Sequence, residues 1–205
     1  MKKGFFITFE GGEGSGKTTL LENIRKYLES KNRNFIFTRE PGGTVLGEEI
    51  RELVLRKRKE KIAAKAELCL FLASRAQHIQ EIILPSLKEG KIVLSDRYND
   101  SSIAYQGFAR GLGMEEVIQF SFYIIEDAIP DLTIFLDIDP KIGLSRVKGN
   151  YDRIESEKIL FHQKIREGFL ILADKFPERI KIIDATLSQE EVFQNAMNYI
   201  QKLLK

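Results

Sequence analysis

The stretch FFITFEGGEGSGKTTL, residues 5–20, decides the fold of this 205-residue chain. Its apolar run, residues 5–9, is typical of a buried strand, and residues 11–18 then match the pattern G-x-x-x-x-G-K-[ST]. Glycines let such a loop turn tightly and point its N–H groups into an anion nest, to which the next helix adds its positive dipole end. A glycine-rich turn could match by chance. The strand before it and the helical spacing of the apolar residues 20–28 after it favour a nucleoside-triphosphate site.

The residues of this loop have distinct expected roles. Lys17 is expected to reach the β- and γ-phosphates, and the Thr18 hydroxyl is expected to ligate Mg²⁺, the predicted cofactor. The predicted ATP-binding residues of the loop are Gly11, Gly12, Glu13, Gly14, Ser15, Gly16, Lys17, Thr18 and Thr19.

The composition gives no reason to expect a polyanionic partner. There are 32 Lys and Arg against 30 Asp and Glu, a net charge of +2, so we expect neither nucleic acid nor a membrane as partner. The one cysteine, Cys69, excludes an internal disulfide and is expected in the core. The first apolar run is too short for a signal peptide, which favours a cytoplasmic location. The length fits one domain, residues 1–205.

Strand-like apolar runs alternate with amphipathic helical stretches along the chain. This alternation predicts a three-layer α/β fold, a parallel sheet with helices on both faces, in which ligands gather at the carboxyl ends of the strands. The runs are residues 5–9, 35–38, 91–95, 132–136 and 180–183. Three helix boundaries are also predicted, by Gly90, by Asp139 with Pro140, and by a capping box over Ser188–Glu191.

Charged residues follow the second and third predicted strands. Arg39 comes directly after the second strand, and Asp96 and Arg97 come directly after the third. Asp96 stands where a P-loop protein needs an acidic group for Mg²⁺, and Arg97 is suited to a second phosphate. The alternative is an ion pair between Asp96 and Arg97 that only closes the strand end. The glycine loop at the same edge favours the phosphate site.

Two helical groups of residues suggest a pocket for an acceptor. Phe71 and Arg75 are four residues apart and share a helix face, so they could stack on a flat base and bond its edge, although Phe71 also suits a core position. Polar and aromatic side chains with helical spacing follow Arg97, and they are Ser101, Ser102, Tyr105 and Gln106.

The segment RVKGNYDRIE, residues 146–155, is typical of a flap. It carries three cations, Arg146, Lys148 and Arg153, around a glycine and an asparagine. A cation delivered by a closing segment neutralises the transferred phosphoryl group, and closure excludes water. A solvated loop with incidental ion pairs is the alternative.

With these motifs in hand, the chain resembles the bacterial thymidylate kinases, which transfer the γ-phosphoryl group of ATP to dTMP. The resemblance runs from residue 5 to about residue 185. It rests on FEGGEGSGKTT, TREPGGT, FLASRAQH, SDRYNDSSIAYQG, LDIDPKIGLSR, DRIE and IIDA, which occur in the family's order. The resemblance implies a five-stranded parallel sheet and a homodimer. It also implies that Asp184 and Ala185, in the last motif, and Arg146, in the flap, contact ATP.

The resemblance assigns roles in the acceptor site. Arg39 and Arg97 would hold the dTMP phosphate, and Asp96 would organise Mg²⁺ and water. Glu13 would approach the 3′-hydroxyl of the deoxyribose or its metal. The base and sugar contacts would come from Phe71 stacking on thymine, Arg75 donating to its O4, Ser101, Ser102 and Gln106 flanking the acceptor, and Tyr105 favouring deoxyribose.

The resemblance also directs attention to the flap as the source of a catalytic cation. Some members carry an arginine in the glycine loop where this chain has Gly14, so the cation should come from the flap, the lid at residues 146–155. Arg153, in the intact DRIE, is the first candidate, with Arg146 and Lys148 as alternatives. The predicted catalytic residues are Lys17, Asp96, Arg97 and Arg153.

Two other functions are compatible with the glycine loop. A deoxynucleoside kinase would need a carboxylate base and would have less use for Arg39 and Arg97. A P-loop switch or motor would hydrolyse ATP without an acceptor, and a GTPase would carry N-K-x-D, which this chain lacks. Transfer to a phosphate needs no general base, because the acceptor oxygen is already ionised near neutral pH.

Overall fold

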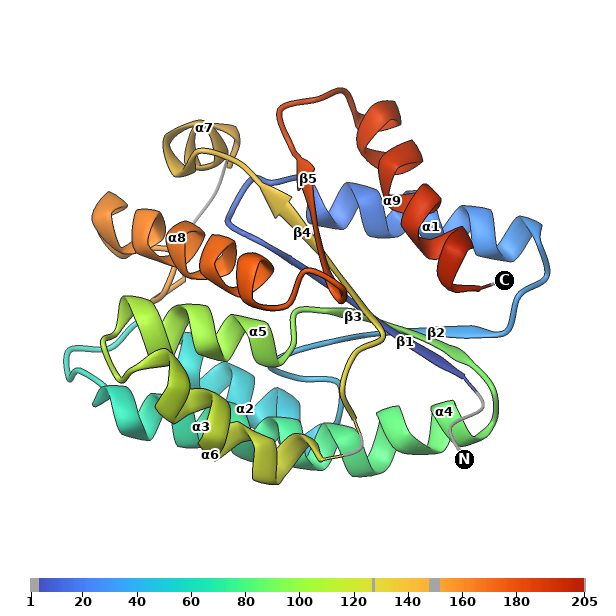
Figure 1. Cartoon of the computed structure of the whole chain (residues 1–205). Helices are drawn as coiled ribbons and strands as arrows, with labels where there is room; N and C mark the ends of the chain where they lie inside the picture. The colour runs from blue at the N-terminus through green and yellow to red at the C-terminus, as the bar shows by residue number, and fades with distance from the viewer. Residues whose placement is uncertain (1–3, 127, 148–151, 205) are drawn as a thin grey trace.

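The structure, a computed structural model, describes residues 4–126, 128–147 and 152–204. Its centre is a five-stranded, all-parallel sheet in the order β2-β3-β1-β4-β5 (Figure 1). The strands are β1 (Phe5–Gly11), β2 (Phe35–Arg39), β3 (Ile92–Asp96), β4 (Leu132–Asp137) and β5 (Ile180–Asp184). The predicted α/β sheet is confirmed. Each strand continues one or two residues past its predicted end, because the polar residues there still pair although they interrupt the apolar run.

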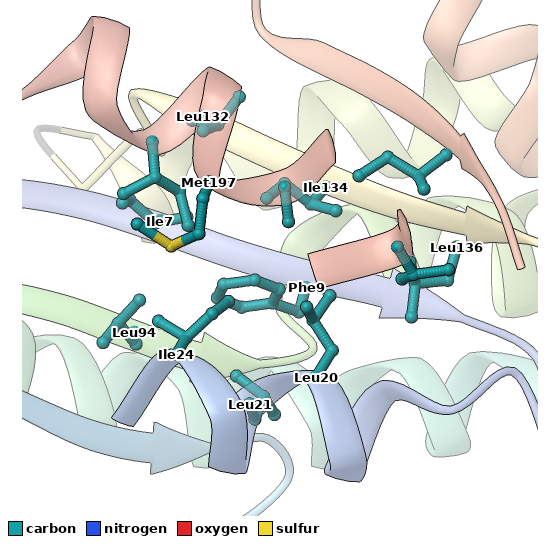
Figure 2. Close-up of a cluster of buried hydrophobic side chains, with 14 of the residues drawn as sticks. Ile7, Phe9, Leu20, Leu21, Ile24, Leu94, Leu132, Ile134, Leu136 and Met197 are labelled. Carbon is teal, nitrogen blue, oxygen red and sulfur yellow. The ribbon is translucent and has the colours of Figure 1, made fainter. Parts of the chain in front are cut away.

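Helices cover both faces of the sheet, as predicted (Figure 1). On one face, α1 and α9 pack on Ile7, Phe9 and neighbouring strand residues to form the apolar core drawn in Figure 2. On the other face, α3, α6 and α8 pack on residues such as Phe135. The helical segments are α1 (Lys17–Ser30), α2 (Val45–Leu55), α3 (Ala64–His78), η1 (Ile79–Ile83), α4 (Leu84–Lys88), α5 (Asn99–Ser102), η2 (Ile103–Ala109), α6 (Met114–Ile125), α7 (Pro140–Arg146), α8 (Ile159–Lys175) and α9 (Gln189–Leu203).

The alternation of side chains along β1 determines where the polar residues of this strand lie. Ile7 and Phe9 enter the core beneath α1 and α9. Phe6 packs with Tyr98 in a separate apolar cluster. Glu10 accepts a hydrogen bond from the N–H of Tyr98, which follows β3. Because successive strand residues point to opposite faces, Glu10 is buried next to Ser101 of α5 and not in the apolar core.

The predicted helix boundaries are confirmed. Asp139 accepts a hydrogen bond from the Lys141 N–H at 2.7 Å, with Pro140 at the first helical position. The capping box at Ser188 is complete, and Gly90 takes φ 80° just before β3. Within the described residues, none of the helices combines the length and apolar character needed to cross a bilayer.

The expectation for Cys69 was wrong, because this side chain is exposed. The stretch ELCLFLA is apolar on nearly all sides, so the pattern did not show which face of α3 is buried. That face begins at Glu67 and Leu68 and continues through Leu72 and Arg75.

Candidate active site

The glycine loop lies between β1 and α1, where the sheet edge and a helix N-terminus meet. Gly14 and Gly16 have φ of 68° and 84°, a region that favours glycine. Gly14 also has a neighbour that leaves no room for a side chain, because an added Cβ would lie 1.9 Å from the Gly143 carbonyl oxygen. This contact leaves no room for an arginine at position 14 of this chain, and it packs the loop against α7.

The strand ends place two ion pairs beside the loop. Lys17 Nζ lies 2.8 Å from Asp96 Oδ1, and Arg97 Nη2 donates to Glu13 Oε1 at 2.8 Å. Although burial raises the pKa of Asp96, Lys17 and Arg97 hold this pKa below its usual value. Burial, and then the nearby Arg97, lower the pKa of Lys17. The segment that carries these charges turns at Arg97 itself, which has φ 68°.

A cavity of about 260 Å³ opens on the Arg97 side of the loop. Every residue predicted for the acceptor lines it, including the two arginines expected at its phosphate. The predicted residues on its wall are Glu13, Lys17, Thr18, Arg39, Phe71, Arg75, Asp96, Arg97, Ser101, Ser102, Tyr105 and Gln106. The sequence predictions missed Glu40, Pro41, Arg51, Leu55, Tyr98, Asp152, Ile154 and Glu155, which also line it.

A second pocket, of about 630 Å³, lies on the other side of the loop. Its wall includes residues 12–20, Arg146, Ala185 and Gln189. Arg146 Nη1 donates to the Ala185 carbonyl at 3.1 Å and to the Gly14 carbonyl at 3.4 Å. The predicted Asp184 is not on this wall, because its side chain turns back to accept hydrogen bonds from Thr186.

The two pockets meet at the glycine loop. Glu13, Lys17 and Thr18 belong to both walls. Lys17 therefore stands between the two spaces. The Thr18 hydroxyl and the Asp96 carboxylate are oxygen donors at this point, the kind of donor that Mg²⁺ takes in small number together with phosphate oxygens.

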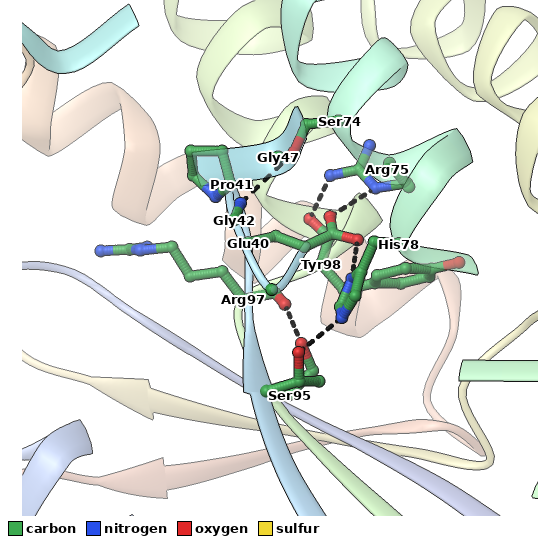
Figure 3. A network of polar contacts seen from close by, with 12 residues as sticks. Glu40, Pro41, Gly42, Gly47, Ser74, Arg75, His78, Ser95, Arg97 and Tyr98 are labelled. Carbon is green, nitrogen blue, oxygen red and sulfur yellow. Dashed lines mark hydrogen bonds and ion pairs between the residues drawn. The ribbon is translucent and has the colours of Figure 1, made fainter. Parts of the chain in front are cut away.

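Arg75 lines the cavity one helical turn after Phe71 on α3, and its guanidinium is held by the protein. Arg75 is 1% exposed. It donates from Nε to Glu40 at 2.7 Å, from Nη1 to Ser102 and Asn99 at 2.9 and 3.1 Å, and from Nη2 to the Tyr98 carbonyl at 3.0 Å. Figure 3 shows Arg75, Glu40 and Tyr98 as part of one polar network.

Arg153, the first candidate for the catalytic cation of the lid, is held by contacts to α2 and α3. Its Nη2 lies 2.6 Å from Glu67, a carboxylate buried in α3, and its Nε donates to the Val54 carbonyl at 2.7 Å. It does not line either pocket, so this arrangement does not bring it to the glycine loop. Glu67 also accepts from Gln106 and Arg110, at 2.9 and 3.2 Å. The alternative cation Lys148 lies outside the described residues.

Glu10 and Glu155 are two of the acidic residues near the site that the sequence predictions missed. Glu10 is fully buried, and burial raises its pKa to about 7. A signal for it existed, since it is a charged residue in an otherwise apolar strand. Glu155 faces the loop, and burial, followed by the carboxylates of Asp152 and Glu13, raises its pKa. No sequence pattern links Glu155 to Glu13.

Two pockets that meet at Lys17, the first of them lined by several arginines, define a P-loop phosphotransferase with a phosphorylated donor and a phosphorylated acceptor. Comparisons of the chain with known proteins agree with this class. The thymidylate kinase family model matches residues 9–196. Similar proteins include the thymidylate kinase of Protochlamydia amoebophila (strain UWE25), 51% identical over 98% of this chain and 93% of that protein. Another, from Acholeplasma laidlawii (strain PG-8A), is 48% identical over 97% and 100%.

A solved structure is also similar. The crystal structure of thymidylate kinase from Ehrlichia chaffeensis superposes with a TM-score of 0.79 at 35% identity, covering 97% of this chain and 98% of that one. The chain belongs to the thymidylate kinase family.

Proposed function

We propose that this chain transfers the γ-phosphoryl group of ATP to dTMP, giving dTDP and ADP, and that its 205 residues act as one kinase domain. The observation that carries the proposal is the position of Lys17 on the walls of both pockets. ATP occupies the pocket lined by Arg146 and Ala185, and dTMP occupies the cavity lined by Arg97 and Phe71. Family membership supports both assignments.

The transfer requires positioning and charge neutralisation more than proton chemistry. The N–H groups of the glycine loop and Lys17 hold the donor phosphates. Arg97 and Arg39 hold the acceptor phosphate, with Arg39 turned toward Glu48 at 2.9 Å until the acceptor arrives. When bound, Mg²⁺ neutralises charge on the donor phosphates, and Thr18 and Asp96, with Glu13 nearby, are the residues that would hold it.

The acceptor base and sugar lie between the remaining wall residues. Phe71 stacks on thymine, and Arg75 donates to its O4. Tyr105, whose ring centre is 5.3 Å from the Arg97 guanidinium, crowds the sugar and favours deoxyribose. Ser101, Ser102 and Gln106 flank the base.

The lid cation is assigned to Arg146 in preference to Arg153. Arg146 already donates to the glycine loop, whereas Arg153 is held by Glu67. Arg153 stabilises the lid against α3.

We further propose a homodimer that works in the cytoplasm, where ATP and deoxynucleotides are available. Large exposed apolar side chains on α2 and α6, two helices that both pack against α3, support the dimer. Val45 on α2 is 81% exposed, and Tyr123 on α6 is 79% exposed. Sedimentation analysis of the full chain gives the oligomeric state, and a monomer at micromolar concentration would contradict this part of the proposal.

A coupled assay with ATP and Mg²⁺ across a panel of nucleoside monophosphates tests the proposed reaction. We expect ADP release to depend on added dTMP. Turnover with thymidine instead of dTMP would favour a deoxynucleoside kinase, and ADP release without any acceptor would favour a P-loop switch or motor. Either result would overturn the proposal.

A further inference from the structure

A buried chain of polar contacts runs from Arg75 through Glu40, both on the wall of the acceptor cavity, to His78, which does not line it. Glu40, 4% exposed, uses one carboxylate oxygen for Arg75 Nε at 2.7 Å and the other for His78 Nδ1 at 2.9 Å. His78 is fully buried, and its Nε2 lies 2.5 Å from Thr38 Oγ1. Figure 3 shows the Glu40 carboxylate between the side chains of Arg75 and His78. Neither Glu40 nor His78 was singled out from the sequence.

The contacts determine which way the groups face. An ionised carboxylate can only accept hydrogen bonds, so the Nδ1 of His78 must carry a proton. His78 is itself fixed at its other nitrogen by Thr38, at the end of β2. The Glu40 carboxylate is therefore held between Arg75 and His78 on one helical segment, and His78 is held in turn by Thr38 on β2.

The hydrogen bonds of Arg75 determine how many donors it can offer to a ligand. A guanidinium has five N–H groups, and the described residues accept from four of them. The remaining N–H belongs to Nη2, and Arg75 lines the acceptor cavity. Arg75 can thus offer a single donor and no acceptor to a base.

We propose that Glu40, oriented by His78, is a positioning residue that sets base selectivity by fixing the guanidinium of Arg75 with its one remaining N–H toward the acceptor base. This inference rests on the proposed function, in which Arg75 donates to the thymine O4. The ligand class it selects is a pyrimidine monophosphate with a carbonyl oxygen at that edge. A pyrimidine with an amino group there would set one donor against another, and the unmet hydrogen bond costs affinity.

A purely structural role makes a different prediction. The same network packs residues 42–44 on α3, since the Gly42 N–H donates to Ser74 at 3.3 Å and an added Cβ at Gly43 would come within 2.9 Å of His78. If packing were the only role, weakening the network would lower activity toward every acceptor by the same factor. Selective positioning instead changes the ratio between acceptors.

The test measures kcat and KM for dTMP and dCMP in the full-length Glu40→Gln variant. This substitution keeps the side-chain shape but removes the charge that holds the Arg75 guanidinium in a buried place. We expect the dTMP to dCMP ratio of kcat/KM to fall about 10- to 100-fold, the usual effect of a charged hydrogen bond. The change should appear in the KM for dTMP, with the KM for ATP unchanged. Glu81→Gln, at an exposed glutamate on η1, is the matched control.

A second pair of variants keeps the test decisive if Glu40→Gln does not fold. Asparagine can donate from Nδ2 about where His78 donates from Nδ1, and leucine cannot. His78→Asn should therefore keep most of the selectivity, while His78→Leu should lose it, although both remove the ring. Equal losses for all acceptors, or an unchanged ratio, would overturn the inference while leaving the kinase assignment intact. A wild-type chain inactive on dTMP would overturn the proposed function and the inference with it.

Discussion

The stability of this protein should depend on pH through Glu10, and the structure sets the size of the effect. Its carboxylate accepts from the Tyr98 N–H at 2.9 Å and from the Ser101 hydroxyl at 2.6 Å, yet burial still raises its pKa from 4.5 to about 7. Between these two values the folded state binds more protons than the unfolded state, so the free energy of unfolding falls as pH rises. Glu10→Gln keeps an oxygen for the Tyr98 N–H and removes the charge.

The magnitude follows from the two pKa values. A full shift corresponds to about 3 kcal/mol, of which about 2 kcal/mol develops between about pH 5.5 and pH 8. Wild type and Glu10→Gln share every other titrating group, so the difference between their unfolding free energies isolates this one. We therefore expect Glu10→Gln to gain about 2 kcal/mol on wild type over that interval.

Urea unfolding of both proteins at several pH values, followed by circular dichroism, measures this difference. Linear extrapolation gives the free energy of unfolding at each pH, provided that the two slopes agree. A difference that stays constant from about pH 5.5 to about pH 8 would refute the reasoning, because it would mean that Glu10 has the same pKa in the folded and unfolded states.

Three further substitutions test the site directly. Lys17→Ala should lower kcat at least about 100-fold with an unchanged circular dichroism spectrum, since a preorganised charge at the phosphates is lost, and retention of a tenth of the activity would count against the assignment. Arg97→Ala should raise the KM for dTMP about 10- to 100-fold and the KM for ATP far less, and equal effects in steady-state kinetics would contradict its role at the acceptor phosphate. Gly143→Ala would place a Cβ 2.2 Å from the Glu13 carbonyl oxygen, so we expect a loss of about 1–3 kcal/mol in thermal unfolding and weaker ATP binding. Wild-type values for Gly143→Ala would mean that the loop and α7 separate freely.

The sheet and the phosphate loop could be predicted because their signals are local. A strand is a short apolar run, and the loop is a fixed spacing of glycines before a lysine. The position of Asp96 at the end of β3 could also be predicted. The carboxyl ends of neighbouring parallel strands meet at one edge of the sheet, and this brings Asp96 to Lys17.

The contacts between helices could not be predicted in the same way. Glu67 was not recognised because its partners lie far along the chain, with Arg110 43 positions away. Its neighbour Cys69 was placed in the core on hydrophobicity, yet Glu67 is buried and Cys69 is exposed. Burial of a carboxylate becomes favourable only when its cations are present, and a single helix does not reveal them.

The two described ends of the proposed lid, residues 146–155, line different pockets. Arg146 lines the donor pocket and donates to the glycine loop. Ile154 and Glu155 line the acceptor cavity instead, next to Arg153 on Glu67. Glu67 also accepts a hydrogen bond from Gln106, which lines the acceptor cavity. We therefore expect a substitution in this cluster to affect the acceptor cavity before the donor pocket. This difference between the two ends of the lid is the reason for proposing Arg146, and not Arg153, as the cation that reaches the transferred group.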